Sequence, residues 1–389
     1  MKRTYASRYE QPEGPVYLDC NATAPLEPDV RDAVTHWLAE EIGNAGSRTH
    51  TYGSQAKRAV QHAREQVVAI VEASPDEIVF TSGATESNNL AILGLVPWGE
   101  QHDRRHIVST AIDHKAVLEP LEALEKRGFS VTLIKPQATG AVAVEDIAAA
   151  VRPDTLLVSV MHVNNETGVR QPIAGIAEAL ADHDAYFHVD AAQGFGKELE
   201  ALRNPRIDLV SVSSHKIYGP LGVGALVTRR RGFKRAPLTP LIYGGGQERG
   251  LRPGTLPVPL IVGFGLAAEI AGRDNEARKQ RCLDMRQHAL SALEPLNVRF
   301  HGDPDLILPH VLNFSIEGVD SEALIVALKD VAAVSNGSAC TSHSYEPSHV
   351  LQAMGLEDSA IAGALRLSWC HLTPDVDWQA MAKRIGTML

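Results

Sequence analysis

Polar side chains that could act in catalysis follow five short apolar segments of the sequence. These five loops start at Thr81, Asp113, Asn164, Asp190 and Ser213. If the apolar segments are parallel strands, their carboxyl ends lie along one edge of a sheet, where open α/β sheets bind their ligands. A single lysine or histidine in a loop is commonly a solvated surface charge. Five such loops at one edge indicate a ligand site instead.

Three of these features fit a phosphorylated pyridine cofactor. Segment 82–85, Ser-Gly-Ala-Thr, lies between a strand and a helix, where backbone N–H groups and hydroxyls hold a phosphate, although simple N-capping explains it equally well by itself. Asp190 can keep a pyridine nitrogen protonated, so that the ring withdraws electrons. Lys216, as a neutral amine, can hold an aldehyde as a Schiff base. We therefore expect pyridoxal 5'-phosphate as the cofactor.

A histidine at another strand end can support the same chemistry. His114 is placed to stack on a cofactor ring or to move protons near neutral pH, although a lone histidine is more often a core residue satisfied by the backbone. Nucleotide-binding motifs are the competing explanation. The sequence has no G-x-x-x-x-G-K-[ST] pattern, and segment 263–268, Gly-Phe-Gly-Leu-Ala-Ala, continues an apolar helical stretch. We interpret that segment as a packing feature.

The hydrophobic pattern predicts elements in an order that brings these loops together. Strands are expected at 78–80, 107–110, 156–163, 186–189, 209–213 and 311–316, and helices at 54–73, from 88, 116–128, 173–183, 257–296 and 321–329. Helix 54–73 shows apolar residues three and four apart, and the run 156–163 is mostly apolar, as in a strand buried on both faces. Alternating strands and helices predict an α/β fold with a mostly parallel sheet. The pattern loosens after about Pro257, so we expect a second, smaller domain.

Composition excludes several classes of protein. The chain has 389 residues, 44% hydrophobic and 22% charged, so it can bury a core without disulfides. Its formal net charge of −10 argues against strong direct binding of nucleic acid. No apolar run is long enough for a membrane span, and the start lacks a signal peptide, so we expect no membrane association and a cytoplasmic location. Four cysteines without a C-x-x-C pair predict neither a disulfide scaffold nor a bound metal.

Seven motifs follow one another along most of the chain. They are 17–19 Tyr-Leu-Asp, 81–87 Thr-Ser-Gly-Ala-Thr-Glu-Ser, 161–168 Met-His-Val-Asn-Asn-Glu-Thr-Gly, 214–220 Ser-His-Lys-Ile-Tyr-Gly-Pro, 244–250 Gly-Gly-Gly-Gln-Glu-Arg-Gly, 252–255 Arg-Pro-Gly-Thr and 335–342 Ser-Asn-Gly-Ser-Ala-Cys-Thr-Ser. Any one motif could be a coincidence. The ordered set, from about Val16 to near the C-terminus, closely resembles the group I cysteine desulfurases, which are fold-type I relatives of the class V aminotransferases.

The resemblance implies a fold and a division into domains. A large domain that binds pyridoxal phosphate, with a mostly parallel, seven-stranded sheet, would cover residues 27–265. A smaller α+β domain would consist of residues 1–26 together with 266–389, and would carry the catalytic cysteine loop at about 335–346.

The resemblance also implies a role for each site residue. Lys216 would bind the cofactor covalently, Asp190 would pair with the pyridinium nitrogen, and His114 would stack over the ring and assist proton transfer. Gln193 would hydrogen-bond the ring hydroxyl. The carboxylate of the substrate, L-cysteine, would be bound by Asn165 and, through a two-pronged ion pair, by Arg366. The cofactor phosphate would be surrounded by Ala84, Thr85, Ser213, His215 and, from the other subunit of a homodimer, Thr255.

Cys340 would decide the reaction. It lies among small polar residues, which is typical of an exposed loop. As a thiolate, with His114 or His343 as a neighbouring base, it would attack the sulfur of the bound L-cysteine. The products would be L-alanine and a persulfide on Cys340. The loop is of the longer, group I kind, which could carry the persulfide to an acceptor protein.

The acceptor is left open by the sequence. The chain stops at Leu389, without the extension that housekeeping members use to dock the iron–sulfur scaffold. Its absence argues against delivery to that scaffold and leaves room for a protein of nucleic-acid modification, as in DNA phosphorothioation or tRNA thiolation. We therefore expect the acceptor to be an iron–sulfur scaffold or a protein of nucleic-acid modification. We interpret Cys370, where relatives commonly have a Gly-Arg pair, as a buried structural cysteine, and the basic run 229–235 as a solvated hairpin.

Two alternatives belong to other classes. An ordinary class V aminotransferase, or a lyase that releases selenium or pyruvate, would share the cofactor site; the presence of Cys340 argues against the aminotransferase. A non-catalytic platform of a modification complex would keep the fold alone. The joint presence of Lys216, Asp190, His114 and Cys340 argues against that alternative.

Overall fold

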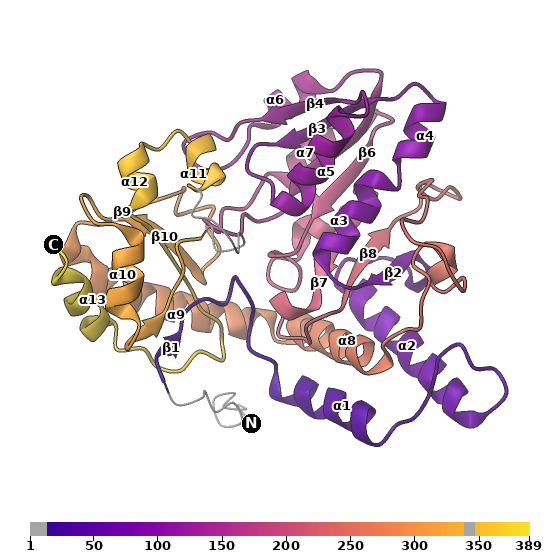
Figure 1. Ribbon diagram of the computed structural model, residues 1–389, viewed down its shortest axis with the longest axis horizontal. Helices are drawn as coiled ribbons and strands as arrows, with labels where there is room; N and C mark the ends of the chain where they lie inside the picture. The colour runs from indigo at the N-terminus through magenta and orange to yellow at the C-terminus, as the bar shows by residue number, and fades with distance from the viewer. Residues whose placement is uncertain (1–13, 338–346) are drawn as a thin grey trace.

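The largest unit of the protein is a seven-stranded sheet (Figure 1). The computed structural model describes residues 14–337 and 347–389. The strands are β2 (Ile78–Thr81), β3 (His106–Thr110), β4 (Ser130–Ile134), β5 (Thr155–Met161), β6 (Tyr186–Asp190), β7 (Leu209–Ser213) and β8 (Gly224–Thr228). They lie in the order β2-β8-β7-β6-β5-β3-β4, and β8 alone runs antiparallel to its neighbours. The predicted α/β fold with a mostly parallel sheet is therefore confirmed.

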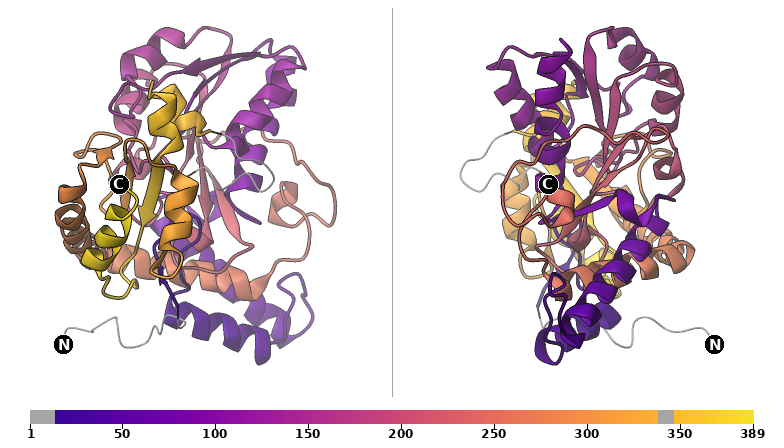
Figure 2. Two further views of the ribbon diagram at one scale, coloured as in Figure 1. Left: turned by 60° about the vertical axis from the view of Figure 1, so that its left-hand side comes forward. Right: turned by 90° about the vertical axis from the view of Figure 1, so that its right-hand side faces the viewer.

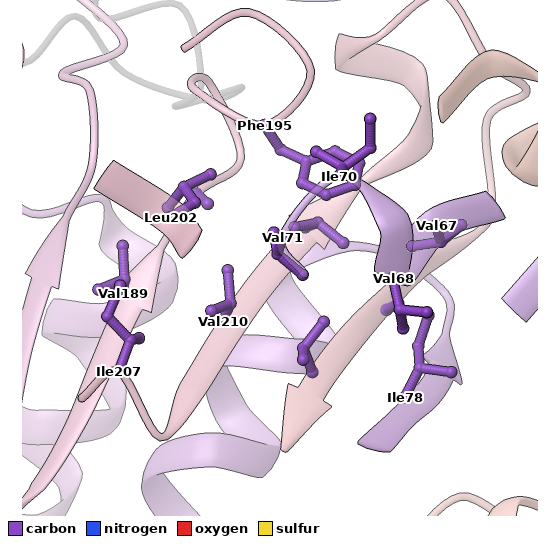
Figure 3. Close-up of a cluster of buried hydrophobic side chains, with 14 of the residues drawn as sticks. Val67, Val68, Ile70, Val71, Ile78, Val189, Phe195, Leu202, Ile207 and Val210 are labelled. Carbon is purple, nitrogen blue, oxygen red and sulfur yellow. The ribbon is translucent and has the colours of Figure 1, made fainter. Parts of the chain in front are cut away.

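Successive strand residues point to opposite sides of the sheet, and both sides carry apolar side chains. Helices therefore cover both faces. The helices are α1 (Pro28–Ala39), α2 (Thr51–Ala69), α3 (Ala84–Leu93), α4 (Val96–Gln101), α5 (Lys115–Glu125), α6 (Val144–Ala150), α7 (Ile173–Ala179) and α8 (Val258–Arg273). On one face, Val158 and Val210 belong to a buried cluster with residues of α2, α6, α7 and α8. On the other face, Leu157 and Leu209 cluster with residues of α3 and α5. Figure 3 shows part of the first cluster, where Val210 of the sheet lies near Val71 and Val189 lies near Ile207.

The two helices α2 and α8 approach each other closely at one end of the molecule, where α1 also packs on α8 (Figure 2). A Cβ atom on Gly265 would lie only 2.7 Å from the Cα of Ala63. The glycines of segment 263–268 therefore allow helix contact, which confirms that this segment is a packing feature. Among the described helices, none has both the length and the apolarity required to cross a bilayer.

A smaller group of elements surrounds a three-stranded antiparallel sheet in the order β12-β10-β9. Its elements are α9 (Asn275–Leu293), β9 (Arg299–Phe300), β10 (Val311–Ser315), α10 (Ser321–Leu328), α11 (His349–Ala353), α12 (Asp358–Ala362), β12 (Ala364–Ser368) and α13 (Trp378–Gly386). Strand β1 (Val16–Tyr17) pairs in parallel with β11 (Ala332–Ala333), so the indigo start of the chain in Figure 1 joins the orange elements of this group. The domain boundaries at 26/27 and 265/266 stay a prediction.

Two details differ from the predicted elements. Helix α3 begins at Ala84, not near Asn88, because its first turn is polar and lacks the apolar spacing that predicts a helix. The stretch 257–296 is broken at Asp274 into α8 and α9. The earlier start of α3 matters for the site, since it places a helix N-terminus directly after β2.

The basic run 229–235 is a hairpin, and three of its arginines form ion pairs within the protein. Arg231 Nε lies 2.6 Å from Asp208 Oδ1, and Arg235 Nη2 lies 2.6 Å from Asp76 Oδ2. Arg229 is buried and donates to backbone carbonyl oxygens, so the prediction of a solvated hairpin is wrong for this residue.

Candidate active site

A cavity of about 390 Å³ opens at the carboxyl ends of the parallel strands. Ten residues that the sequence placed in the site line it: Ala84, Thr85, His114, Asn165, Asp190, Gln193, Ser213, His215, Lys216 and Arg366. Asp190 ends β6 and Ser213 ends β7, as expected for a site at this edge of the sheet. The structure therefore brings together residues that are up to 282 positions apart (366 − 84).

The turn between β2 and α3 forms one wall of the cavity. Gly83 has φ +154°, close to the extended limit, and a Cβ atom on Gly224 of β8 would lie 2.6 Å from its Cα. Only a glycine at position 224 allows this approach. The turn directs the N-terminus of α3, with its free N–H groups and partial positive charge, into the cavity. This is an arrangement that binds phosphate.

His215 lies on the same side of the cavity as a neutral group. Burial, together with the positive charges of Lys216 and Lys197, lowers the pKa of His215 to about 4. Its Nδ1 atom lies 3.1 Å from Thr23 Oγ1. When Nδ1 accepts from this hydroxyl, Nε2 carries the proton and can donate to a phosphate oxygen.

The N-terminal segment holds the lysine of the site. Lys216 Nζ donates to the carbonyl oxygens of Asn21 and Ala22, the latter at 2.7 Å. Gln193 Nε2 donates to the same Asn21 carbonyl at 2.9 Å, and Asn21 Nδ2 donates to the Asn165 carbonyl at 3.0 Å. Asn21 thus links three predicted site residues, yet the sequence analysis missed it. The available signal was its place two residues after the motif 17–19.

Asp190 is a buried carboxylate without a cationic partner among the described ion pairs. Its Oδ2 accepts from Asn88 Nδ2 at 2.7 Å, and its Oδ1 accepts from the Ala192 N–H at 3.0 Å. These two donors orient the carboxylate, but a buried charge also needs an opposite charge nearby. A pyridinium nitrogen would supply it. Asn88, one turn into α3, is a second residue that the sequence analysis missed.

Gln193 provides a further test of the fit. Its Oε1 atom is buried and has no hydrogen-bond partner within the described structure. Because an unsatisfied buried oxygen is unfavourable, this atom calls for a donor such as a ring hydroxyl. Together with the α3 N-terminus and Asp190, it makes the cavity complementary to pyridoxal phosphate at the phosphate, the ring nitrogen and the ring hydroxyl.

Arg366 of β12 presents a buried guanidinium to the cavity. Its Nη1 donates to the Asn165 carbonyl at 2.9 Å, and its Nη2 lies 2.6 Å from Asp19 Oδ1. Its Nε is buried and lacks an acceptor among the described residues. A free N–H on a guanidinium that is otherwise fixed is suited to binding a carboxylate.

His114 is oriented by its own helix and by the residue before it. Its Nδ1 accepts from the Ala116 N–H at 3.1 Å. Asp113 Oδ2 accepts from Ser109 and twice from Thr110, and its Oδ1 accepts from the Met161 N–H at 2.8 Å. Burial raises the pKa of Asp113 to about 6. This network links β3 to β5 at Asp113, the residue that precedes His114.

Among the described residues that were predicted for the site, one does not line the cavity. Thr255 is exposed on this chain, and its role toward a second subunit stays a prediction. Cys340, like His343, lies outside the described residues. The chain on either side of them is held at one place: a Cβ atom on Gly337 would lie 3.4 Å from Glu166 Oε2, and Ser348 Oγ donates to the same oxygen. Glu166 adjoins Asn165 of the cavity.

The three described cysteines are buried outside the cavity. Cys370 is 0% exposed and Cys20 is 2% exposed, and their side chains are in contact. This contact and burial raise the pKa of Cys20, and burial raises that of Cys282 to about 12. The thiols of Cys20 and Cys282, held in this protonated form, are unreactive, and Cys370 is shielded by its complete burial. The interpretation of Cys370 as a buried structural cysteine is confirmed.

Comparisons with known proteins identify the family. The family model described as aminotransferase class-V matches residues 16–380. The chain is 45% identical over 366 residues to the cysteine desulfurase IscS of Vibrio cholerae, which covers 93% of this chain and 90% of that protein. The chain belongs to the class-V aminotransferases and is a cysteine desulfurase.

Further relatives of this desulfurase agree. It is 44% identical to the cysteine desulfurase of Mus musculus, over 94% of this chain and 80% of that protein. The crystal structure of DndA from Streptomyces lividans is similar with a TM-score of 0.80 and 52% identity, covering 91% of this chain and 99% of that one. A NifS-like protein has a TM-score of 0.88 at 34% identity, over 96% and 98% of the two chains. Pyridoxal phosphate is the cofactor of this family, so the desulfurase uses the cofactor that the cavity fits.

Proposed function

We propose that this desulfurase binds L-cysteine between Arg366 and Lys216, and that Cys340 takes up the sulfur and passes it to an acceptor protein. The observation that carries the proposal is the convergence of Lys216, Asp190 and Arg366 on one cavity. Pyridoxal phosphate, when bound, supplies the electron sink that makes the α-hydrogen of the substrate acidic.

The residues of the chain then have separate tasks. Arg366, through its free Nε and with Asn165, would fix the substrate carboxylate, so that the α-carbon lies at a set position. The Lys216 amine, held by the carbonyls of Asn21 and Ala22, would take the α-proton. His114, whose ring is oriented by the hydrogen bond from the Ala116 N–H, would donate a proton in a later step as a general acid.

The sulfur step requires a thiolate. The Cys340 sulfur would attack the substrate sulfur, so that an S–S bond forms while the substrate C–S bond breaks. The carbon retains the electron pair of that bond and takes up a proton, and L-alanine leaves. Cys340 follows Gly337 by three residues, and Gly337 lies beside Glu166 next to the cavity, which supports this role.

The test is product formation by the holoenzyme with L-cysteine and a thiol reductant. Equal amounts of L-alanine and sulfide are expected, and both should be lost in Cys340→Ala. Cys282→Ala, which removes a buried thiol outside the cavity, serves as the control and should retain both products. Undiminished alanine in Cys340→Ala would overturn the persulfide step. Mass spectrometry should find one extra sulfur atom on the peptide that contains Cys340.

We also propose a homodimer in which Thr255 reaches the cofactor phosphate of the other subunit. Large apolar side chains that are exposed on the single chain support an interface: Ile42, Tyr52, Phe233 and Tyr243. Light scattering should give twice the mass of the chain. Thr255→Ala should weaken cofactor retention without changing that mass, whereas a monomer would overturn the proposal.

The acceptor would be an iron–sulfur scaffold or a protein of nucleic-acid sulfur modification, in the cytoplasm. The identity of 52% with DndA exceeds the 45% with IscS and is compatible with the alternative of DNA phosphorothioation. The experiment measures transfer of labelled sulfur from the Cys340 persulfide to a purified iron–sulfur scaffold and to a purified protein of nucleic-acid modification. The protein that receives the label is the acceptor.

A further inference from the structure

A second, smaller cavity lies between the large sheet and helix α9. It has a volume of about 40 Å³, and its lining shares no residue with the cofactor cavity. On one side it is lined by Lys197 and Tyr218, and on the other side by Arg278, Lys279 and His310. One water molecule needs about 10–15 Å³ of such a cavity, so the space holds about three water molecules. This is the size of a small polyatomic ion.

Arg278 lines this cavity with unsatisfied donors. The residue is 7% exposed, its Nη2 pairs with Glu27 Oε2 at 2.6 Å, and its guanidinium lies 4.9 Å from the centre of the Tyr218 ring. Its Nε and Nη1 are buried and have no acceptor among the described residues. Buried N–H groups of a cation are costly when they lack a partner. The missing acceptor therefore belongs in the space beside them.

The other groups at this cavity leave an excess of positive charge. Lys197 Nζ lies 3.4 Å from His310 Nε2, and burial lowers the pKa of Lys197 to about 8, so the amine is still mainly protonated at pH 7. Burial keeps His310 neutral by lowering its pKa. The one carboxylate in the lining, that of Glu198, is engaged by Arg170 at 3.2 Å. Lys279, exposed at the next position after Arg278, adds a further positive charge.

We propose that this cavity binds a free oxyanion of the size of phosphate or sulfate, held by Arg278, Lys197 and Lys279. Arg278 and Lys279 lie in the first two turns of α9, whose N-terminal partial charge adds to the attraction. The volume excludes a nucleotide or a second molecule of cofactor. Lys197 follows β6 of the large sheet, whereas Arg278 belongs to the helix that packs on the smaller sheet, so the bound ion would join the two.

The experiment measures the melting temperature of the holoenzyme as inorganic phosphate is added at constant ionic strength, with chloride as the balancing salt. A saturable rise is expected, of about 2 °C at ten times the dissociation constant. Sulfate should act in the same way. Cofactor absorbance is followed in parallel and should stay constant, because the phosphate-binding site of the cofactor is already filled.

Variants decide whether the response belongs to this cavity. Lys197→Met and Lys279→Gln should each raise the phosphate concentration for half the effect at least fivefold. Lys383→Gln removes an exposed helical lysine elsewhere and should leave it unchanged. Because Arg278→Gln also breaks the pair with Glu27, the lysine variants carry the test. A response without saturation, or one that is the same in all three variants, would overturn the proposal.

Discussion

Arg366 and Asp19 form an ion pair in which Arg366 Nη2 lies 2.6 Å from Asp19 Oδ1, beside the cofactor cavity. The side chain of Arg366 is 3% exposed and that of Asp19 is 18% exposed. The pair, together with the bond from Nη1 to the Asn165 carbonyl, sets the plane of the guanidinium. It leaves Nε without an acceptor among the described residues, and this geometry underlies the first prediction.

Arg366→Lys should weaken binding of L-cysteine more than it slows turnover. Lysine keeps the charge but loses the planar fork that can hold Asp19, the Asn165 carbonyl and a carboxylate at once. We expect KM to rise at least about tenfold, which corresponds to about 1.4 kcal/mol, with kcat within about threefold. Arg286→Lys, which alters a partly buried arginine that donates to the Val311 carbonyl, is the control. Steady-state kinetics with an unchanged KM would contradict the role of Arg366.

Asn21→Ala should lower kcat with little loss of stability. The variant keeps the carbonyl that accepts from Lys216 and Gln193 but loses the bond from Nδ2 to the Asn165 carbonyl. The segment is then free to shift, and we expect a drop in kcat of about tenfold for a loss of about 1 kcal/mol in the free energy of unfolding. Asn204→Ala removes one hydrogen bond, to the Arg206 N–H, far from the cavity, and should leave kcat unchanged. Equal kcat values for both variants would argue against Asn21 as a positioning residue.

Asp113→Asn should destabilise the protein. The carboxylate accepts four hydrogen bonds, and an amide would turn its NH2 group toward donors. We expect the free energy of unfolding to fall by about 2 kcal/mol, measured by urea titration. Ser109→Ala removes one of the four donors and should cost about 1 kcal/mol or less. If both variants lose the same amount, the network is not centred on Asp113.

His188→Gln should reduce the loss of stability in mild acid. His188 is fully buried between Ser159 Oγ at 2.8 Å and Ser211 Oγ at 2.9 Å, and burial lowers its pKa from 6.5 to about 4. Between these two pH values the unfolded chain binds the proton and the folded protein does not, so the free energy of unfolding falls as pH falls. From pH 7 to pH 5 this group should contribute a loss of about 2 kcal/mol.

The test compares urea midpoints of the wild type and His188→Gln at both pH values. Glutamine can still bond the two serines but does not titrate, so the variant should lose about 2 kcal/mol less on acidification. His102→Gln changes an exposed histidine and should follow the wild type. A variant that loses as much stability as the wild type would show that His188 is not responsible.

Strands were predictable where both faces are buried. The stretch 156–163 is mostly apolar because β5 lies inside the sheet, and all residues of β5 are buried. Strand β4 was missed because it is the edge strand, with Ser130 and Leu133 exposed, and so has no continuous apolar run. Strand β8 was missed because it follows the turn 219–222, whose glycines and proline conceal its start.

The residues of the site likewise divide into those that a local sequence pattern predicts and those that it does not. Asp190, Lys216 and His114 were predictable because each follows a strand and carries a reactive side chain. Asn21 was not, because its main contact with the site is made by a backbone carbonyl, and any residue type supplies one. The pair of Arg366 with Asp19 joins residues far apart in sequence, so no local pattern predicts it.

The hydrogen bond from the Asn21 N–H to Ser368 Oγ joins residues 347 positions apart. At about 5–20 residues per second, a ribosome makes them roughly 20–70 s apart. The large sheet is complete by Thr228, so its strands can pair while β12 is still to be translated. The strands that carry Asp190 and Ser213 are therefore translated before Cys340 and Arg366, whereas the contact that fixes Asn21 forms only after Ser368 has been made. The order of translation thus places Asp190 and Lys216 in the chain before the reactive thiol of Cys340.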